Sequence, residues 1–198
     1  MAISQTDRFK RNPHLPRAGT EKQFSEFQLK ELLKCKNDPI YFAKTYFKIV
    51  HVDKGLIPFD LYDYQEKAIE LFQNNRNMIM CASRQCGKTS FATVILLHSA
   101  LFNEEKLIAI LANKGATARE ILSRVKKAYE HLPDFIKGGI LEWNKSSITF
   151  ENGSIIMAEA SSSDNIRGKS CLTGDTRVCV EINGSYYFTE IDNIINKK

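Results

Sequence analysis

The chain has 198 residues, 43% of them hydrophobic, and a net charge of +5, which suits one globular domain, or one domain and a part of another. This composition excludes a disordered chain and a disulfide-stapled miniprotein, and the five cysteines have neither metal-ligand spacing nor a plausible disulfide framework. Because no apolar run approaches the roughly 20 residues that cross a bilayer, we expect a cytoplasmic protein that does not contact membranes.

The first 60 residues predict an arm followed by helices. Residues 1–20 are rich in Arg, Pro and Lys and lack periodicity, so we expect a flexible or partner-ordered arm. From Glu21 apolar residues recur at roughly helical spacing, and Asp38-Pro39 begins a second helical stretch. Residues 21–60 are therefore expected to form a helical lead-in.

Residues 61–170 alternate helical and strand patterns. The expected elements are a helix at 63–74, a buried strand at 77–82, a helix at 89–101, a strand at 107–111, a helix ended by Pro133, and strands at 147–150 and 154–160 joined by a turn at Asn152-Gly153. Strands that alternate with helices indicate an α/β fold. We expect a partial parallel sheet with flanking helices and an added β-hairpin.

A phosphate-binding loop is predicted between the strand at 77–82 and the next helix. Residues 82–89 fit the P-loop pattern except at Ala82, where glycine is usual. Backbone N–H groups would surround the phosphates of ATP, while Lys88 contacts the β- and γ-phosphates and Thr89 contacts Mg²⁺. The candidate nucleotide-binding residues are Ser83, Arg84, Gln85, Cys86, Gly87, Lys88 and Thr89.

Alternatives stay open for this loop. A chance Gly-Lys-Thr could occur at a strand-to-helix turn, although the flanking apolar segments are what the motif requires. Arg84 could reach the γ-phosphate and act catalytically, as an arginine finger does in cis, or it could be a solvated arginine.

Several ordered blocks resemble the large terminase subunit of tailed bacteriophages, from about Glu31 to Ser170. The blocks are Asp38-Pro39-Ile40-Tyr41-Phe42, Leu61-Tyr62-Asp63-Tyr64-Gln65, residues 83–89, Leu132-Pro133-Asp134-Phe135 and Glu142-Trp143-Asn144. The resemblance implies an ATPase that pumps DNA into procapsids, with double-stranded DNA, the portal and the small terminase subunit as partners. It also implies that Gln65 recognises adenine, whereas a helix-surface glutamine is the alternative.

By the same resemblance, the sequence should continue past Ser170 into an apolar strand that ends in Asp-Glu and then into a nuclease domain. Residues 171–198 contain neither feature. The Walker B aspartate and the catalytic glutamate would supply a second Mg²⁺ contact and orient the attacking water. We therefore expect very weak ATP hydrolysis by residues 1–198.

A different pattern begins at Cys171, where residues 171–176 (Cys-Leu-Thr-Gly-Asp-Thr) resemble the opening block of an intein. The resemblance implies that the Cys171 thiol attacks the carbonyl of Ser170 and forms a thioester, without a cofactor. Asp175 and Thr176 would support this splice site, although both could simply cap a turn. A small buried core residue is the alternative for Cys171.

These resemblances lead to one hypothesis and two alternatives. Residues 1–170 would be the N-extein, with a partial P-loop ATPase domain at 61–170, and residues 171–198 a β-rich (Hint) N-terminal fragment of a split intein. Trans-splicing with a partner chain, which carries the remaining intein, Walker B and the nuclease domain, would yield the packaging ATPase. The alternatives are a stand-alone ATP-binding or regulatory fragment that does not hydrolyse ATP, and a truncated terminase gene.

Overall fold

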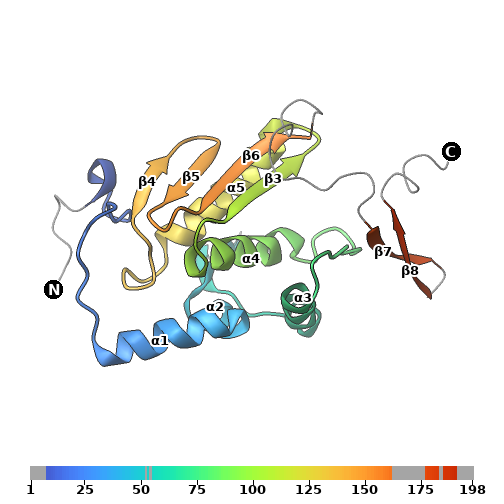
Figure 1. Ribbon diagram of the computed structural model, residues 1–198, viewed down its shortest axis with the longest axis horizontal. Coiled ribbons are helices and arrows are strands. Elements are labelled where there is room, and N and C mark those ends of the chain that lie inside the picture. The colour runs from blue at the N-terminus through green and yellow to red at the C-terminus, as the bar shows by residue number, and fades with distance from the viewer. Residues whose placement is uncertain (1–7, 52, 54, 162–176, 183–184, 191–198) are drawn as a thin grey trace.

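The computed structural model describes residues 8–51, 53, 55–161, 177–182 and 185–190 (Figure 1). Helices combine there with a mixed four-stranded sheet, which confirms a mixed α/β fold. The elements are η2 (Phe9–Arg11), α1 (Glu26–Asn37), α2 (Pro39–Tyr46), β1 (Lys48–His51), β2 (Gly55–Pro58), α3 (Asp63–Asn74), α4 (Lys88–Phe102), β3 (Leu107–Ala112), α5 (Gly115–Glu130), β4 (Ile140–Trp143), β5 (Ser147–Phe150), β6 (Ile155–Ala160), β7 (Arg177–Ile182) and β8 (Ser185–Glu190). None of the described helices is long and apolar enough to span a bilayer.

The described part of the N-terminal arm packs onto the rest of the protein. Leu15 is only 2% exposed, and the N–H of Ile140 donates to the carbonyl of Pro16 at 2.9 Å. Arg8 also pairs with Asp134 at 2.9 Å. A flexible or partner-ordered arm was expected for residues 1–20; from residue 8 onward a buried side chain and main-chain hydrogen bonds hold this segment in place.

The helical lead-in begins as expected but includes a hairpin. The Ser25 hydroxyl accepts a hydrogen bond from the N–H of Gln28 and thereby caps α1, and the Asp38 carboxylate caps α2 in the same way. Strands β1 and β2 then pair antiparallel. The apolar spacing of residues 21–46 predicted the two helices, whereas the hairpin was not expected.

A buried carboxylate joins α1 to α2. Glu31 is 4% exposed and accepts hydrogen bonds from the hydroxyls of Tyr41 at 2.7 Å and Tyr46 at 2.6 Å. It also pairs with Lys34 at 3.0 Å. The hydrogen bonds from Tyr46, Tyr41 and Lys34 favour the charged form and lower the pKa of Glu31 to about 2.

The sheet has the strand order β3-β6-β5-β4. Only β3 and β6 are parallel, while β6, β5 and β4 form antiparallel neighbours. The expectation of a parallel sheet is therefore corrected to a mixed one, because the hairpin β5–β6 is part of the sheet and β4 extends it. Helix α5 lies behind the sheet in Figure 1, with Leu122, Val125 and Tyr129 fully buried.

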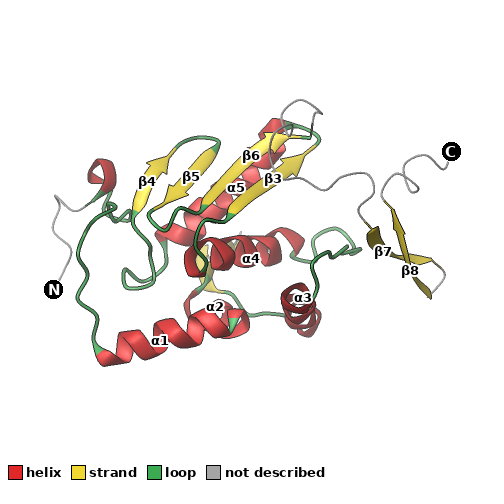
Figure 2. Ribbon diagram, in the orientation of Figure 1, coloured by secondary structure: helices red, strands yellow, loops and turns green. Residues whose placement is uncertain are grey.

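The buried strand expected at residues 77–82 is absent from the sheet. This segment is extended loop between α3 and α4, as Figure 2 shows, and no strand of the described sheets pairs with it. Ile79 is 55% exposed, and Cys81 is exposed as well. A short apolar run signals burial but does not supply a pairing partner, and β3 pairs with β6 instead.

Helix α4 is the central element of the packing. Its buried side chains are distributed around the helix rather than on one stripe: Phe91, Thr93, Val94, Ile95, Leu97, His98 and Ala100. His98 Nε2 lies 2.7 Å from the carbonyl of Cys35, and it must carry the proton because a carbonyl only accepts. Burial lowers the pKa of His98, so its ring stays neutral in the core.

The two C-terminal strands, β7 and β8, pair with each other antiparallel. Both strands lie within residues 171–198, the segment that was expected to be β-rich. In Figure 1 the hairpin is drawn beyond the α/β part of the chain.

The Glu31 contacts predict an acid-sensitive junction between α1 and α2. Because the folded pKa of Glu31, about 2, lies below the ordinary value of 4.5, the carboxylate stabilises the fold fully above pH 4.5 and loses this effect as the pH falls toward 2. Glu31→Gln should flatten the fall in the urea unfolding midpoint across this interval. The exposed Glu70→Gln is the control; equal slopes for wild type and Glu31→Gln would contradict the assignment.

Candidate nucleotide-binding site

The loop before α4 turns sharply into the helix at Gly87. Gly87 is the N-cap of α4 with φ 75°, and Gln85 also has a positive φ, 65°. The Gly87 carbonyl accepts the N–H of Phe91 at 3.0 Å, which closes the first turn. The N–H groups of this turn have no partners inside the helix, so they are free to bind an anion.

Lys88 points back into its own loop. Its ammonium donates to the carbonyl of Ala82 at 2.7 Å and also to the carbonyl of Ser83. The Cys86 thiol donates to the same Ser83 carbonyl at 3.0 Å. A phosphate group would compete with these carbonyls for the ammonium, which already lies at the centre of the loop.

The remaining predicted loop residues are exposed or half-buried. Ser83, Arg84 and Gln85 are exposed, and Arg84 has no ion pair among the described residues. Thr89 is half-buried in the first turn of α4, and its carbonyl accepts a hydrogen bond from the Thr93 hydroxyl. An ammonium, helical N–H groups and the Thr89 hydroxyl are the groups that a Mg²⁺-bound phosphate chain requires, so these residues fit ATP and Mg²⁺.

The start of α3 packs against this loop. The Tyr64 hydroxyl donates to the carbonyl of Cys86, and Gln65 Nε2 lies 3.5 Å from the carbonyl of Gly87. Gln65 is completely buried, and its Oε1 accepts the N–H of Tyr62 at 3.0 Å. The sequence singled out Gln65 but not Tyr64, because a contact between a helix and a loop more than twenty residues later leaves no local signal.

The four residues predicted to act at the splice site are not placed by the structure. Ser170, Cys171, Asp175 and Thr176 all lie outside the described residues. Their roles remain predictions.

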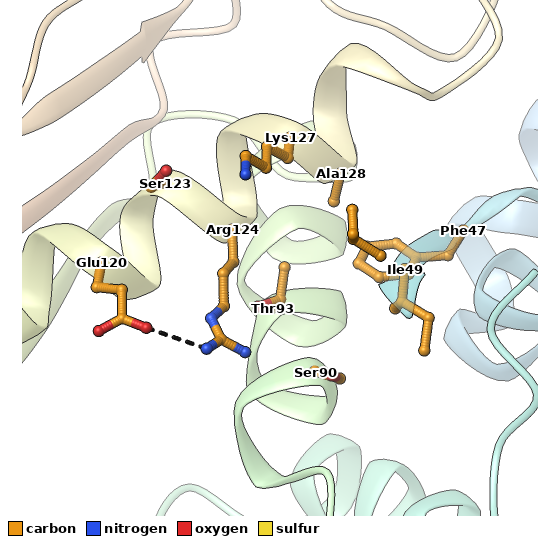
Figure 3. A pocket seen from close by; sticks show the side chains of 10 residues that line it. Phe47, Ile49, Ser90, Thr93, Glu120, Ser123, Arg124, Lys127 and Ala128 are labelled. Atoms are coloured by element: carbon orange, nitrogen blue, oxygen red, sulfur yellow. Dashed lines mark hydrogen bonds and ion pairs between the residues drawn. The ribbon is translucent and has the colours of Figure 1, made fainter. Parts of the chain in front are cut away.

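A separate pocket of about 370 Å³ lies between β1, α4 and α5 (Figure 3). Its polar lining includes Ser90, Ser123 and Lys127, together with an ion pair at 3.0 Å between Arg124 and Glu120. None of the loop residues 82–89 lines it. The pocket is therefore distinct from the phosphate-binding loop.

Part of the chain matches a known protein family. Residues 79–175 match the family described as terminase large subunit, T4likevirus-type, N-terminal. The matched stretch includes the loop, α4, β3, α5 and the strands β4 to β6. It supports the prediction of a terminase large subunit, and it leaves residues 1–78 and 176–198 outside the similarity.

The geometry at Gly87 predicts that a side chain there is costly. A Cβ would lie 2.6 Å from Gln65 Nε2, and the positive φ disfavours any L-residue. Gly87→Ala should therefore lower the free energy of unfolding by about 2 kcal/mol or more, through αL strain and overpacking. Urea unfolding measures the change.

Gly19 provides a matched control for this substitution. Gly19 has φ 77°, but a Cβ there meets nothing within 4 Å. Gly19→Ala should cost only the backbone strain, on the order of 1–2 kcal/mol. Equal losses of unfolding free energy in the two variants would mean that Gln65 does not restrict the space at Gly87.

Proposed function

We propose that this chain is the ATP-binding N-terminal part of a DNA-packaging terminase large subunit. The observation that carries the proposal is the turn at Gly87, which aims the Lys88 ammonium and the first N–H groups of α4 into one loop. The family match across this loop supports the same function. Double-stranded DNA, the portal and the small terminase subunit would be partners of the complete enzyme.

ATP and Mg²⁺ would be held by the chain's own loop. Lys88 would exchange its carbonyl partners for β- and γ-phosphate oxygens, and the Thr89 hydroxyl would contact Mg²⁺. Arg84, which has no ion pair among the described residues, could then neutralise charge on the γ-phosphate. Binding of ATP, rather than its rapid hydrolysis, is the activity proposed for residues 1–198.

Lys88→Ala tests ATP binding directly. Removing a charge-assisted hydrogen bond to phosphate should weaken Mg²⁺-ATP binding by about 10-fold or more, measured by isothermal titration calorimetry. Lys114→Ala is the control, because Lys114 is exposed at the start of α5. Unchanged affinity in Lys88→Ala, or equal losses in both variants, would contradict the proposed site.

We further propose that the sheet is completed by a second polypeptide. Among the described residues no strand pairs with the outer edge of β3, where Leu107 is 50% and Leu111 is 42% exposed. Residues 78–82 belong to none of the described sheets. Open edges and exposed apolar side chains favour addition of a strand. A partner chain that carries the Walker B strand would supply it.

The proposed route to the complete enzyme is trans-splicing at Cys171. The thiol would attack the Ser170 carbonyl carbon, the C–N bond would break, and the Cys171 nitrogen would leave as an amine that takes up the thiol proton. The resulting thioester can pass residues 1–170 to a nucleophile on the partner. The residue pattern at 171–176 and the β7–β8 hairpin support this proposal.

Cys171→Ala separates splicing from the alternative of a stand-alone ATP-binding fragment. With a complementary intein chain present, the wild-type protein should give a product in which residues 1–170 are ligated to the partner, detected by mass spectrometry. Cys171→Ala should abolish that product, because alanine has no nucleophile, whereas Cys179→Ala should retain it. Absence of ligation by the wild type, or ligation by Cys171→Ala, would contradict splicing at Cys171 and favour a stand-alone ATP-binding fragment.

A further inference from the structure

Two consecutive residues of α3 contact two consecutive carbonyls of the phosphate-binding loop. Tyr64 donates through its hydroxyl to the Cys86 carbonyl, and Gln65 lies with Nε2 at 3.5 Å from the Gly87 carbonyl. A Cβ at Gly87 would lie 2.6 Å from Nε2 and 4.0 Å from the Tyr64 hydroxyl. The first turn of α3 is therefore in direct contact with the turn that begins α4.

Gln65 has little freedom to bind anything else. Its side chain is 0% exposed, Oε1 accepts the N–H of Tyr62, and the Gln65 N–H donates back to the Tyr62 carbonyl at 2.8 Å. These reciprocal bonds fix the amide at the start of α3. A nucleobase could reach the Gln65 amide only if the amide left the core and gave up its bond with the Tyr62 main chain.

The direction of the two carbonyls determines where the loop's donors point. In a trans peptide the C=O and the following N–H lie in one plane and point in opposite directions. The Cys86 carbonyl faces Tyr64, so the N–H of Gly87 points away from α3, and the Gly87 carbonyl fixes the N–H of Lys88 in the same manner. Backbone N–H groups at this position are the ones that bind phosphate in such loops.

We propose that Tyr64 and Gln65 are positioning residues for the phosphate-binding loop, which set affinity for the phosphate chain of the nucleotide rather than the choice of base. The proposal rests on the ATP-binding function proposed above. It assigns Gln65 a different role from adenine recognition. Tyr64 carries the larger share, because the Gln65 contact, at 3.5 Å, is long for a hydrogen bond.

Inorganic triphosphate distinguishes the two roles because it has the phosphate chain and lacks the base. Tyr64→Phe removes one hydroxyl and should weaken binding of both ATP and triphosphate by the same factor, about 3- to 10-fold, since one hydrogen bond is lost. Gln65→Met removes both the Nε2 donor and the Oε1 acceptor of the Tyr62 N–H at similar volume, and it should also weaken both ligands equally. Calorimetry in the presence of Mg²⁺ measures both affinities on the full chain.

Tyr62→Phe is the matched control. Tyr62 stacks on Tyr64 with ring centroids 5.6 Å apart and is 64% exposed, so loss of its hydroxyl should leave both affinities unchanged. Weaker ATP binding with unchanged triphosphate binding in Tyr64→Phe or Gln65→Met would overturn the proposal in favour of base recognition. Unchanged binding of both ligands would overturn it too.

If the wild-type chain binds neither ATP nor triphosphate, that result refutes only the proposed function. The positioning role is then tested by a measurement without nucleotide. Release of the Cys86 carbonyl should loosen the first turn of α4, which the Phe91 N–H closes on the Gly87 carbonyl. Tyr64→Phe should therefore speed amide hydrogen exchange at Phe91 several-fold, as measured by NMR, while Tyr62→Phe should not. Equal exchange at Phe91 in Tyr64→Phe and wild type would refute positioning.

Discussion

The structure depends on the burial of α4. Apolar side chains leave this helix in several directions, and His98 adds a hydrogen bond to the main chain of α1. A helix that is apolar around most of its circumference is stable only when other elements surround it. Here α2, α5 and β6 do so, and the start of α4 is consequently held at a fixed place beside α3. This packing therefore also fixes the position of the candidate phosphate-binding loop.

Much of the fold could be predicted because its signals are local. Periodic apolar residues located α3 and α5, a continuously apolar stretch located α4, and Asn152-Gly153 located the turn between β5 and β6. The errors share a cause, which is that pairing and packing partners are distant in sequence. Residues 77–82 have a strand's composition but belong to none of the described sheets. Strand β4 joins the four-stranded sheet by pairing with β5. The arm is likewise held by residues far along the chain, since Arg8 pairs with Asp134 and the N–H of Ile140 donates to the Pro16 carbonyl.

The candidate site shows the same division between local and distant information. The residue types at 87–89 predicted a helix N-terminus with an ammonium and a hydroxyl, and the structure has α4 begin at Lys88. The bonds of Lys88 to its own loop could not be predicted, because they depend on the path of the backbone between Ala82 and Gly87. The contact from Tyr64 arises from tertiary packing of α3 on this path.

The contacts at the loop are confined to a short stretch of the chain. Tyr64, Gln65, Gly87 and Lys88 contact one another, or the loop itself, within residues 62–91. Among the described residues, no bond in this set involves the edge of β3. A partner that completes the sheet would act at β3 and along 77–82, so it would reach the loop through its first residues, at Ala82 and Ser83. Because the Lys88 ammonium is bound to those two carbonyls, the lysine is the group through which sheet completion and phosphate binding would be coupled.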